Sequence, residues 1–123
     1  MMIDGFPDDA HSVTLLSNRL RQDLRVAMKA RDTITVATLR MILAAIDHAG
    51  AVVQTADHRP TVGRSGDVAR RLLSLEDLEA ILSHERGERE RAMGEYSRVG
   101  RTEEVAKLQQ EVRIITRYLA GSD

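Results

Sequence analysis

The stretch "VATLRMILAAIDHA", residues 36–49, decides the fold class of this chain. Its apolar residues are Val36, Ala37, Leu39, Met41, Ile42, Leu43, Ala44, Ala45 and Ile46. They do not alternate with polar residues, as in a half-buried strand, but continue almost all the way round a helix. Although "TITV" at residues 33–36 favours a strand, the run that follows predicts a helix that begins near Asp32 or Thr33. A helix that is apolar on most sides is typical of the centre of a bundle.

Capping residues predict the ends of three further helices. Ser12 is a candidate N-cap, and Ser74 with Asp77 forms a capping-box pattern. Gly100 is expected to end the helix that Ser74 begins, and Thr102 to cap the last helix. The apolar faces carry, in chain order, Leu16, Leu20, Leu24, Ala27 and Met28, then Leu75, Leu78, Ile81, Leu82, Ala92, Met93 and Tyr96, then Val105, Leu108, Val112, Ile115 and Leu119. The pattern predicts an all-α fold, a small bundle of about four helices arranged as two αα-hairpins.

The length of 123 residues fits one domain. We expect a flexible N-terminal segment over residues 1–11, the helical domain over 12–119 and a short tail over 120–123. Residues 52–73 contain proline and glycine and little periodicity, which predicts a long loop between the second and third helices.

Composition excludes several classes of protein. Eighteen Lys and Arg balance nineteen Asp and Glu, and neither half of the chain has the basic excess typical of nucleic-acid binders. The absence of cysteine excludes disulfides and thiolate chemistry. The longest apolar run, "MILAAI" at 41–46, is too short to span a membrane, and the N-terminus lacks a signal-peptide pattern. We expect a soluble, cytoplasmic protein that does not associate with membranes.

The stretch "HERGERERAMGEYSRVGR", residues 84–101, has two interpretations, an arginine-rich grip on RNA or the solvated face of a helix. Its expected ion pairs are Glu85 with Arg89, Arg86 with Glu90, and Glu88 with Arg91. Glutamates that pair with the arginines would repel phosphate, which favours the solvated face. Gly87 and Gly94 lie seven residues apart, so they either admit a neighbouring helix or subunit or have no special role.

Candidate binding and catalytic residues are few. The only locally basic window lies in the expected loop, and its nucleic-acid-binding candidates are Arg59, Arg64, Arg70 and Arg71. "HERGE" at 84–88 lacks the second histidine of a zinc-binding H-E-x-x-H motif. No nucleophile elbow or P-loop is present, and "GRSG" at 63–66 matches a GxxG loop without the sheet that a KH domain needs. We predict no catalytic residue, no metal site and no cofactor.

The layout of the whole chain resembles the GatB/YqeY family over roughly residues 15–119. "LRQDLRVAMKARDTITVATLRMILAAIDHA" at 20–49 is similar to its first two helices, with "AMKAKD"-like and "LRMLLAAI"-like runs. Residues 73–123 share its "LSxEE"-like cap, charged helix, "AGR"-like turn and terminal "YL". Here "YLAGSD" at 118–123 stands where family members have "YLP" and a second helical module, so we interpret the chain as the first helical subdomain alone.

The resemblance implies a link to tRNA-dependent amidotransferases, which are carbon–nitrogen ligases with glutamine as amide donor. In that machinery the domain is an accessory to other, catalytic domains, and its stand-alone versions are small bacterial proteins.

Three hypotheses follow. The first is a non-catalytic binding module that acts through a protein partner or self-association. Its exposed apolar contacts would be Ile114, Tyr118 and Leu119, with Gly87 and Gly94. The second is a tRNA-binding accessory that uses the basic loop. The third, an enzyme, would need two titratable groups within hydrogen-bond reach in a pocket.

Overall fold

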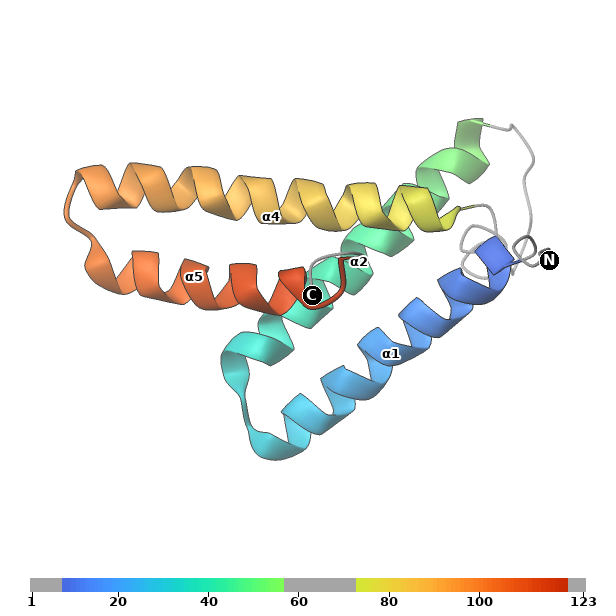
Figure 1. The fold of residues 1–123 in the computed structure, drawn as a ribbon, viewed down its shortest axis with the longest axis horizontal. Helices are drawn as coiled ribbons and strands as arrows, with labels where there is room; N and C mark the ends of the chain where they lie inside the picture. The colour runs from blue at the N-terminus through green and yellow to red at the C-terminus, as the bar shows by residue number, and fades with distance from the viewer. Residues whose placement is uncertain (1–7, 57–72, 120–123) are drawn as a thin grey trace, which may run out of the picture.

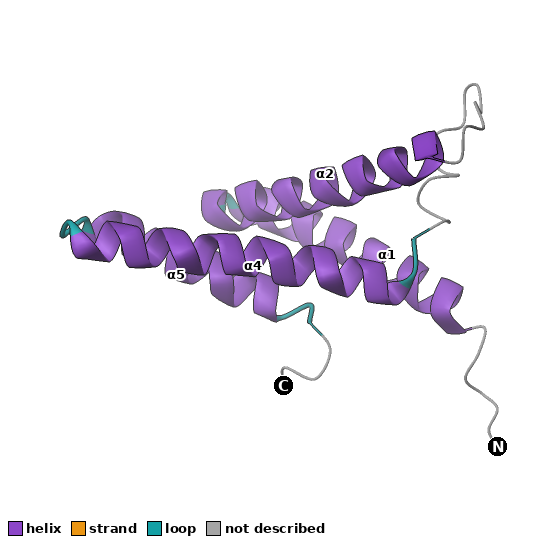
Figure 2. Ribbon diagram, turned by 90° about the horizontal axis from the view of Figure 1, so that it is seen from above, coloured by secondary structure: helices purple, strands orange, loops and turns teal. Residues whose placement is uncertain are grey.

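The computed structural model describes residues 8–56 and 73–119, and all the regular secondary structure in these ranges is α-helical. The helices are α1 (Asp8–Ala30), α2 (Thr33–Ala56), α4 (Leu75–Arg98) and α5 (Thr102–Thr116). α1 and α2 form one hairpin, α4 and α5 form another, and the two hairpins cross (Figure 1 and Figure 2). This arrangement confirms the predicted all-α bundle of two αα-hairpins.

The turn between α1 and α2 follows from helix-capping chemistry. The backbone N–H of Asp32 donates to the carbonyl of Ala27 at 3.0 Å, and that of Arg31 donates to Met28 at 3.1 Å. This is the Schellman pattern, and it places Arg31 in the left-handed region at φ 59°. Asp32 then caps α2, which begins at Thr33 as predicted.

The ends of α4 match the sequence prediction, whereas the start of α5 does not. Asp77 N–H donates to Ser74 Oγ and Ser74 N–H donates to Asp77 Oδ2, both at 3.0 Å, which confirms the capping box. Gly100, at φ 76°, follows the end of α4 as expected. Thr102 is already the first residue of α5, and Arg101 holds the cap position without a side-chain hydrogen bond. The predicted Thr102 cap is therefore wrong by one residue.

Two element boundaries also differ from expectation. α1 begins at Asp8, about one turn before Ser12, so Ser12 lies inside the helix and the expected flexible segment over 1–11 is in part helical. α2 continues to Ala56, into the expected loop at 52–73. Within the two ranges that the structure describes, no helix combines the length and the apolar character needed to cross a membrane.

The core lies where α2 crosses the second hairpin, because α2 packs against α1, α4 and α5. Its most deeply buried apolar side chains, from all four helices, are Leu20, Leu39, Ile42, Leu78, Leu82 and Ile115. Burial of one such side chain stabilises the fold by roughly 1.5–3 kcal/mol. The central position predicted for α2 is confirmed.

One face of α2 nevertheless remains open. Ala37, Met41 and Ala44 are exposed, and Met41 keeps 53% of its surface accessible. These residues are four and three positions apart, so they form a stripe on one side of the helix. The prediction that α2 is buried on most sides is therefore too strong, since its neighbours leave this stripe uncovered.

Candidate functional site: a cationic cleft between α2 and α5

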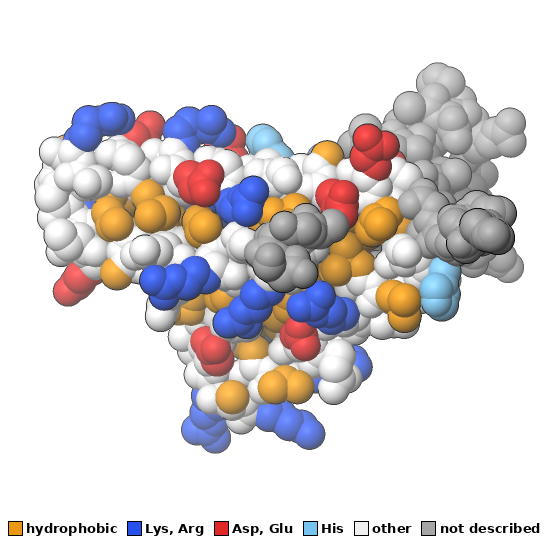
Figure 3. All heavy atoms as spheres, viewed as in Figure 1, with side chains coloured by type: hydrophobic (Ala, Val, Ile, Leu, Met, Phe, Trp, Pro, Cys, Tyr) orange, Lys and Arg blue, Asp and Glu red, His pale blue; other side chains and the backbone are white. Residues whose placement is uncertain are grey.

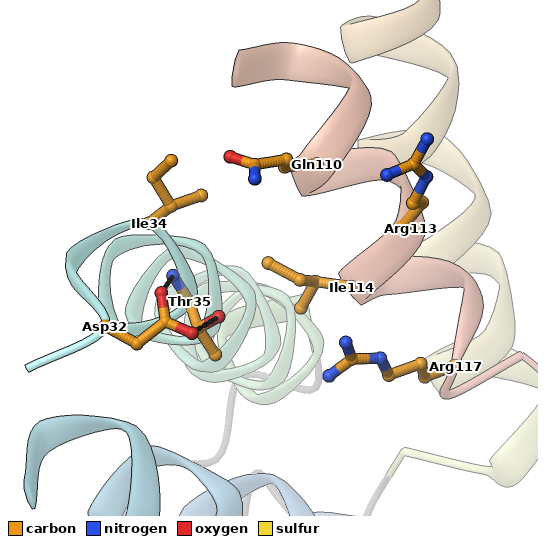
Figure 4. Close-up of a pocket in the computed structure, with 7 residues that line it drawn as sticks. All are labelled: Asp32, Ile34, Thr35, Gln110, Arg113, Ile114 and Arg117. Carbon is orange, nitrogen blue, oxygen red and sulfur yellow. Dashed lines mark hydrogen bonds between the residues drawn. The ribbon is translucent and has the colours of Figure 1, made fainter. Parts of the chain in front are cut away.

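A cleft of about 210 Å³ lies between the start of α2 and the second half of α5 (Figure 4). From the α2 side it is lined by Asp32, Ile34 and Thr35. From α5 and its C-cap residue Arg117 it is lined by Gln110, Arg113, Ile114 and Arg117. The two sets are distant in sequence and are brought together by the crossing of the hairpins.

The α5 residues share one face of the helix, because they are spaced by three, one and three positions. Arg113 and Arg117 are exposed, and within the described ranges neither guanidinium group forms a hydrogen bond or an ion pair. Figure 4 shows Arg117 reaching toward the start of α2, while Arg113 stays beside α5. Figure 3 shows cationic side chains gathered in the middle of this face, where α5 ends over the first hairpin.

Asp32 places one negative charge opposite the arginines. Its carboxylate accepts from the Thr35 hydroxyl at 2.7 Å and from the Thr35 backbone N–H at 3.2 Å. These bonds, the hydroxyl first, lower the pKa of Asp32 below its ordinary value, and the charge of Arg117 adds to the effect. Asp32 is therefore ionised at neutral pH, and the lining of two guanidinium groups and one carboxylate keeps one positive charge.

A polar network beside the cleft fixes the end of α5. The Tyr118 hydroxyl donates to Asp23 Oδ2 at 2.6 Å, and the Arg19 guanidinium lies 4.7 Å from the centre of the Tyr118 ring. Arg19 also donates to the carbonyl of Arg117 at 3.3 Å. Burial, followed by the bond to Asp23, raises the pKa of Tyr118 well above its ordinary value. Tyr118 is therefore neutral and serves as an anchor for the backbone that carries Arg117.

The predicted exposure of the α5 end is wrong. Ile114 and Tyr118 are each 5% exposed and belong to the core, and Leu119 is partly buried against it. Side chains of the α1–α2 hairpin help to cover them, since Tyr118 bonds Asp23 of α1 and all three belong to or pack against the core cluster that includes Leu20 and Leu39. They do not form the exposed apolar patch that the sequence led us to expect.

The arginine-rich stretch is solvated only in part. The pair of Arg91 and Glu88 is exposed and forms as predicted, at 2.6 Å. Arg89 pairs with Glu85 at 2.8 Å, also as predicted, but its side chain is only 9% exposed. It contacts Glu111 of α5 at 2.8 Å as well, so it joins the two helices from inside.

Arg86 was predicted to pair with Glu90. It instead donates to the Thr116 hydroxyl of α5 at 3.3 Å, so a second arginine of this stretch also turns toward the neighbouring helix.

The remaining predicted site residues do not join the cleft. Arg59, Arg64, Arg70 and Arg71 lie outside the described residues. A Cβ added at Gly87 or at Gly94 would meet nothing within 4 Å. The glycines therefore admit no close helix within the described part of the chain, and a contact with a second subunit stays a prediction.

The cleft arginines were missed in the sequence, although a signal was present. Arg113 and Arg117 are four apart on one helix, and the residues one turn before Arg113 are Gln109 and Gln110. Each arginine predicted to pair in the stretch 84–101 has a glutamate three or four residues away. Neither Arg113 nor Arg117 has a carboxylate at that spacing. Two arginines one helical turn apart, with no carboxylate one turn from either, are therefore the sequence pattern that indicates a cationic surface available to a ligand.

Catalytic and metal chemistry find little support in the described ranges. No three His, Cys, Asp or Glu side chains there are grouped so that they could hold a metal ion. Asp23 and Tyr118 are titratable groups within hydrogen-bond reach, the condition set above for an enzyme. They do not line the cleft, however, and the raised pKa of Tyr118 makes it a poor proton donor at neutral pH.

Comparison with known proteins places the chain. Residues 17–121 match the family model described as YqeY-like protein. No curated protein and no solved structure matches the chain significantly. The matched span includes the hairpin crossing and both sides of the cleft, and it covers most of the 123 residues. The chain belongs to the YqeY-like protein family.

Proposed function

We propose that this YqeY-like chain is a helical binding module without chemistry of its own, and that it serves tRNA-dependent amidation through contacts with a protein partner. Membership of the YqeY-like family supports the proposal, and the link to amidation comes from the GatB/YqeY resemblance of the sequence, which implies a helical region attached to the amidotransferase. In that machinery the amide nitrogen of glutamine is transferred to an aminoacyl-tRNA by other domains. The proposal implies a cytoplasmic location, where aminoacyl-tRNAs are made.

The observation that carries a binding role is the composition of the cleft. Two guanidinium groups that have no partner among the described residues line the cleft together with the Gln110 amide, Ile34 and Ile114. These are groups that recognise a ligand by charge and hydrogen bonds. Asp32, the carboxylate of the cleft, is already engaged by Thr35 and held ionised by that bond, which leaves it unsuited to donate a proton.

The test is a binding titration of the intact chain against a purified tRNA-dependent amidotransferase. We expect a discrete complex by light scattering and no amide transfer by the chain alone. Bulk tRNA is titrated in parallel at low and moderate salt. Absence of binding to the amidotransferase would contradict the proposal.

A tRNA-binding accessory is the alternative. Steeply salt-dependent binding of tRNA alone, abolished by a variant with Arg59, Arg64, Arg70 and Arg71 changed to Gln, would establish it instead.

A further inference from the structure

Arg113 and Arg117, one helical turn apart at the end of α5, both line the cleft between α2 and α5, and no described residue pairs with either guanidinium group. Arg89, by contrast, has two carboxylates within 2.8 Å, and Arg101 pairs with Glu104 at 2.9 Å. No described residue accepts a hydrogen bond from Arg113 or Arg117, and the backbone beneath them is fixed by the Tyr118 anchor. Because this backbone is already ordered, binding a ligand costs only the rotamer freedom of the two arginine side chains.

We infer that this cleft binds an acidic segment of a partner protein, with a carboxylate of the segment between Arg113 and Arg117 and an apolar side chain against Ile34 and Ile114. The inference rests on the proposed function, since it names the site and the chemistry of the protein partner proposed above.

The charge of the cleft favours a segment with isolated carboxylates over a nucleic acid. The lining has one net positive charge, because Asp32 offsets one of its two arginines. Asp23, which bonds the residue that follows Arg117, also lies beside the cleft, and its charge is offset by the Arg19 guanidinium 3.9 Å away. A nucleic-acid strand carries a phosphate at every nucleotide, so it would bring several negative charges to a lining with one net positive charge. A single carboxylate matches the net charge and meets the arginine fork in its preferred geometry.

The other lining residues favour a peptide over a small free carboxylate. Ile34 lines the cleft and is partly exposed, so a small polar acid would leave its apolar side chain uncovered. Gln110 is exposed at the opposite rim and has both a donor and an acceptor, as a peptide group requires. An acidic peptide segment with apolar side chains offers all three groups: a carboxylate, an apolar side chain and a peptide group.

The probe is a capped five-residue peptide of leucine and glutamate, titrated into the uniformly ¹⁵N-labelled intact chain. Amide shifts should concentrate at Asp32–Thr35 and Gln110–Arg117. A peptide with glutamine in place of glutamate should not produce them. We expect Arg113→Gln or Arg117→Gln to weaken binding about tenfold, the usual effect of losing a charge-assisted hydrogen bond.

Arg98→Gln is the matched control. Arg98 is an exposed arginine in the last turn of α4, outside the cleft, and its change alters the net charge equally. Its affinity for the acidic peptide should equal that of the unmodified chain. If all three variants lost the same affinity for the acidic peptide, the loss would reflect the overall charge of the chain and not the cleft, and the inference would be overturned.

Two further outcomes overturn it. One is an acidic peptide that shifts no cleft resonance. The other is an oligouridylate that occupies the cleft more tightly than the peptide, which would make this face a nucleic-acid surface.

Failure of the site and failure of the proposed function are distinguishable in the amidotransferase titration. If the intact chain and its Arg113→Gln variant bind the amidotransferase equally, the cleft assignment is overturned and the proposed function stands. If the amidotransferase does not bind but the acidic peptide still occupies the cleft, the proposed function fails and the cleft assignment stands.

Discussion

The two arginine sites that flank α5 differ in what surrounds the guanidinium group. Arg89 lies between α4 and α5, enclosed by Glu85 and Glu111 and 9% exposed at its side chain. Arg113 and Arg117 lie on the cleft side of α5, exposed and without a side-chain partner in the described ranges. One helix thus separates an arginine that holds the fold together from a pair that faces outward.

The difference shows that the role of an arginine here depends on the carboxylates within its reach. A buried guanidinium group costs several kcal/mol in lost hydration unless carboxylates compensate for it, whereas an exposed one keeps its water and its donors. Substitutions should therefore separate the two sites sharply, Arg89 affecting stability and the cleft pair affecting binding.

Arg89→Ala should have the largest effect. The change leaves two partly buried glutamates facing one another without their cation, so we expect the free energy of unfolding to fall by about 3 kcal/mol. Urea unfolding followed by circular dichroism measures it. A triple variant that also carries Glu85→Gln and Glu111→Gln should recover part of the loss. A loss of less than about 1 kcal/mol in the free energy of unfolding would show that the ion pairs of Arg89 contribute no more than exposed surface pairs do.

Tyr118→Phe comes next, and it tests the anchor that fixes the backbone of the cleft arginine Arg117. We expect a loss of about 1.5 kcal/mol, at the low end for a bond to a charged group because the Asp23 side chain is 41% exposed. The pKa of Tyr118 is raised in the folded chain, so the stability it contributes is complete below its ordinary pKa of 10.0 and lost as pH rises above it.

Urea unfolding across the alkaline range measures this contribution, and the Phe variant should lack that part of the alkaline loss. Identical alkaline profiles for the two chains would contradict the assignment.

Asp32→Ala should cost about 1 kcal/mol, the usual loss when a helix cap is removed. The pKa of Asp32 is lowered on folding, so its contribution is present above the ordinary carboxyl pKa and is lost as pH falls through the folded value. Thermal unfolding between neutral and acidic pH should therefore show less acid sensitivity in the variant. Removal of Asp32 should also strengthen binding of the acidic peptide, because the carboxylate opposite the arginines is gone. Weaker peptide binding would mean that Asp32 shapes the cleft.

Arg113→Gln and Arg117→Gln should have the smallest effect on stability, within about 0.5 kcal/mol, because both side chains are exposed and no described residue pairs with them. Urea unfolding provides the measurement. A loss near that of Arg89→Ala would remove the distinction between the two sites.

Much of the fold was predictable because its signals are local. The run of apolar residues in α2, the capping box at Ser74 and the left-handed Gly100 each depend on a few neighbouring residues, and all three predictions hold. The start of α1 at Asp8 was missed because Ser12 is as good a cap in isolation.

The site was harder to predict because it depends on contacts between distant segments. Nothing near Arg89 in sequence shows that Glu111 lies 2.8 Å away, and nothing near Ile114 shows that the first hairpin covers it. The crossing of the hairpins, which creates the cleft, follows from packing of side chains from all four helices. The family resemblance was enough to predict the fold, whereas Arg113 and Arg117 could be recognised as a candidate site only from the structure.

The tight turn at Gly100 has a consequence for the kinetics of folding. It joins α4 to α5 with very little intervening chain, and these two helices pack more extensively than any other pair described. Contacts close in sequence form with a small entropic cost of loop closure, whereas docking α2 onto α4 must first close the segment between Ala56 and Leu75. We expect the second hairpin to be formed in the folding transition state, so that stopped-flow experiments show slower folding for Arg89→Ala and faster unfolding for core substitutions in α1.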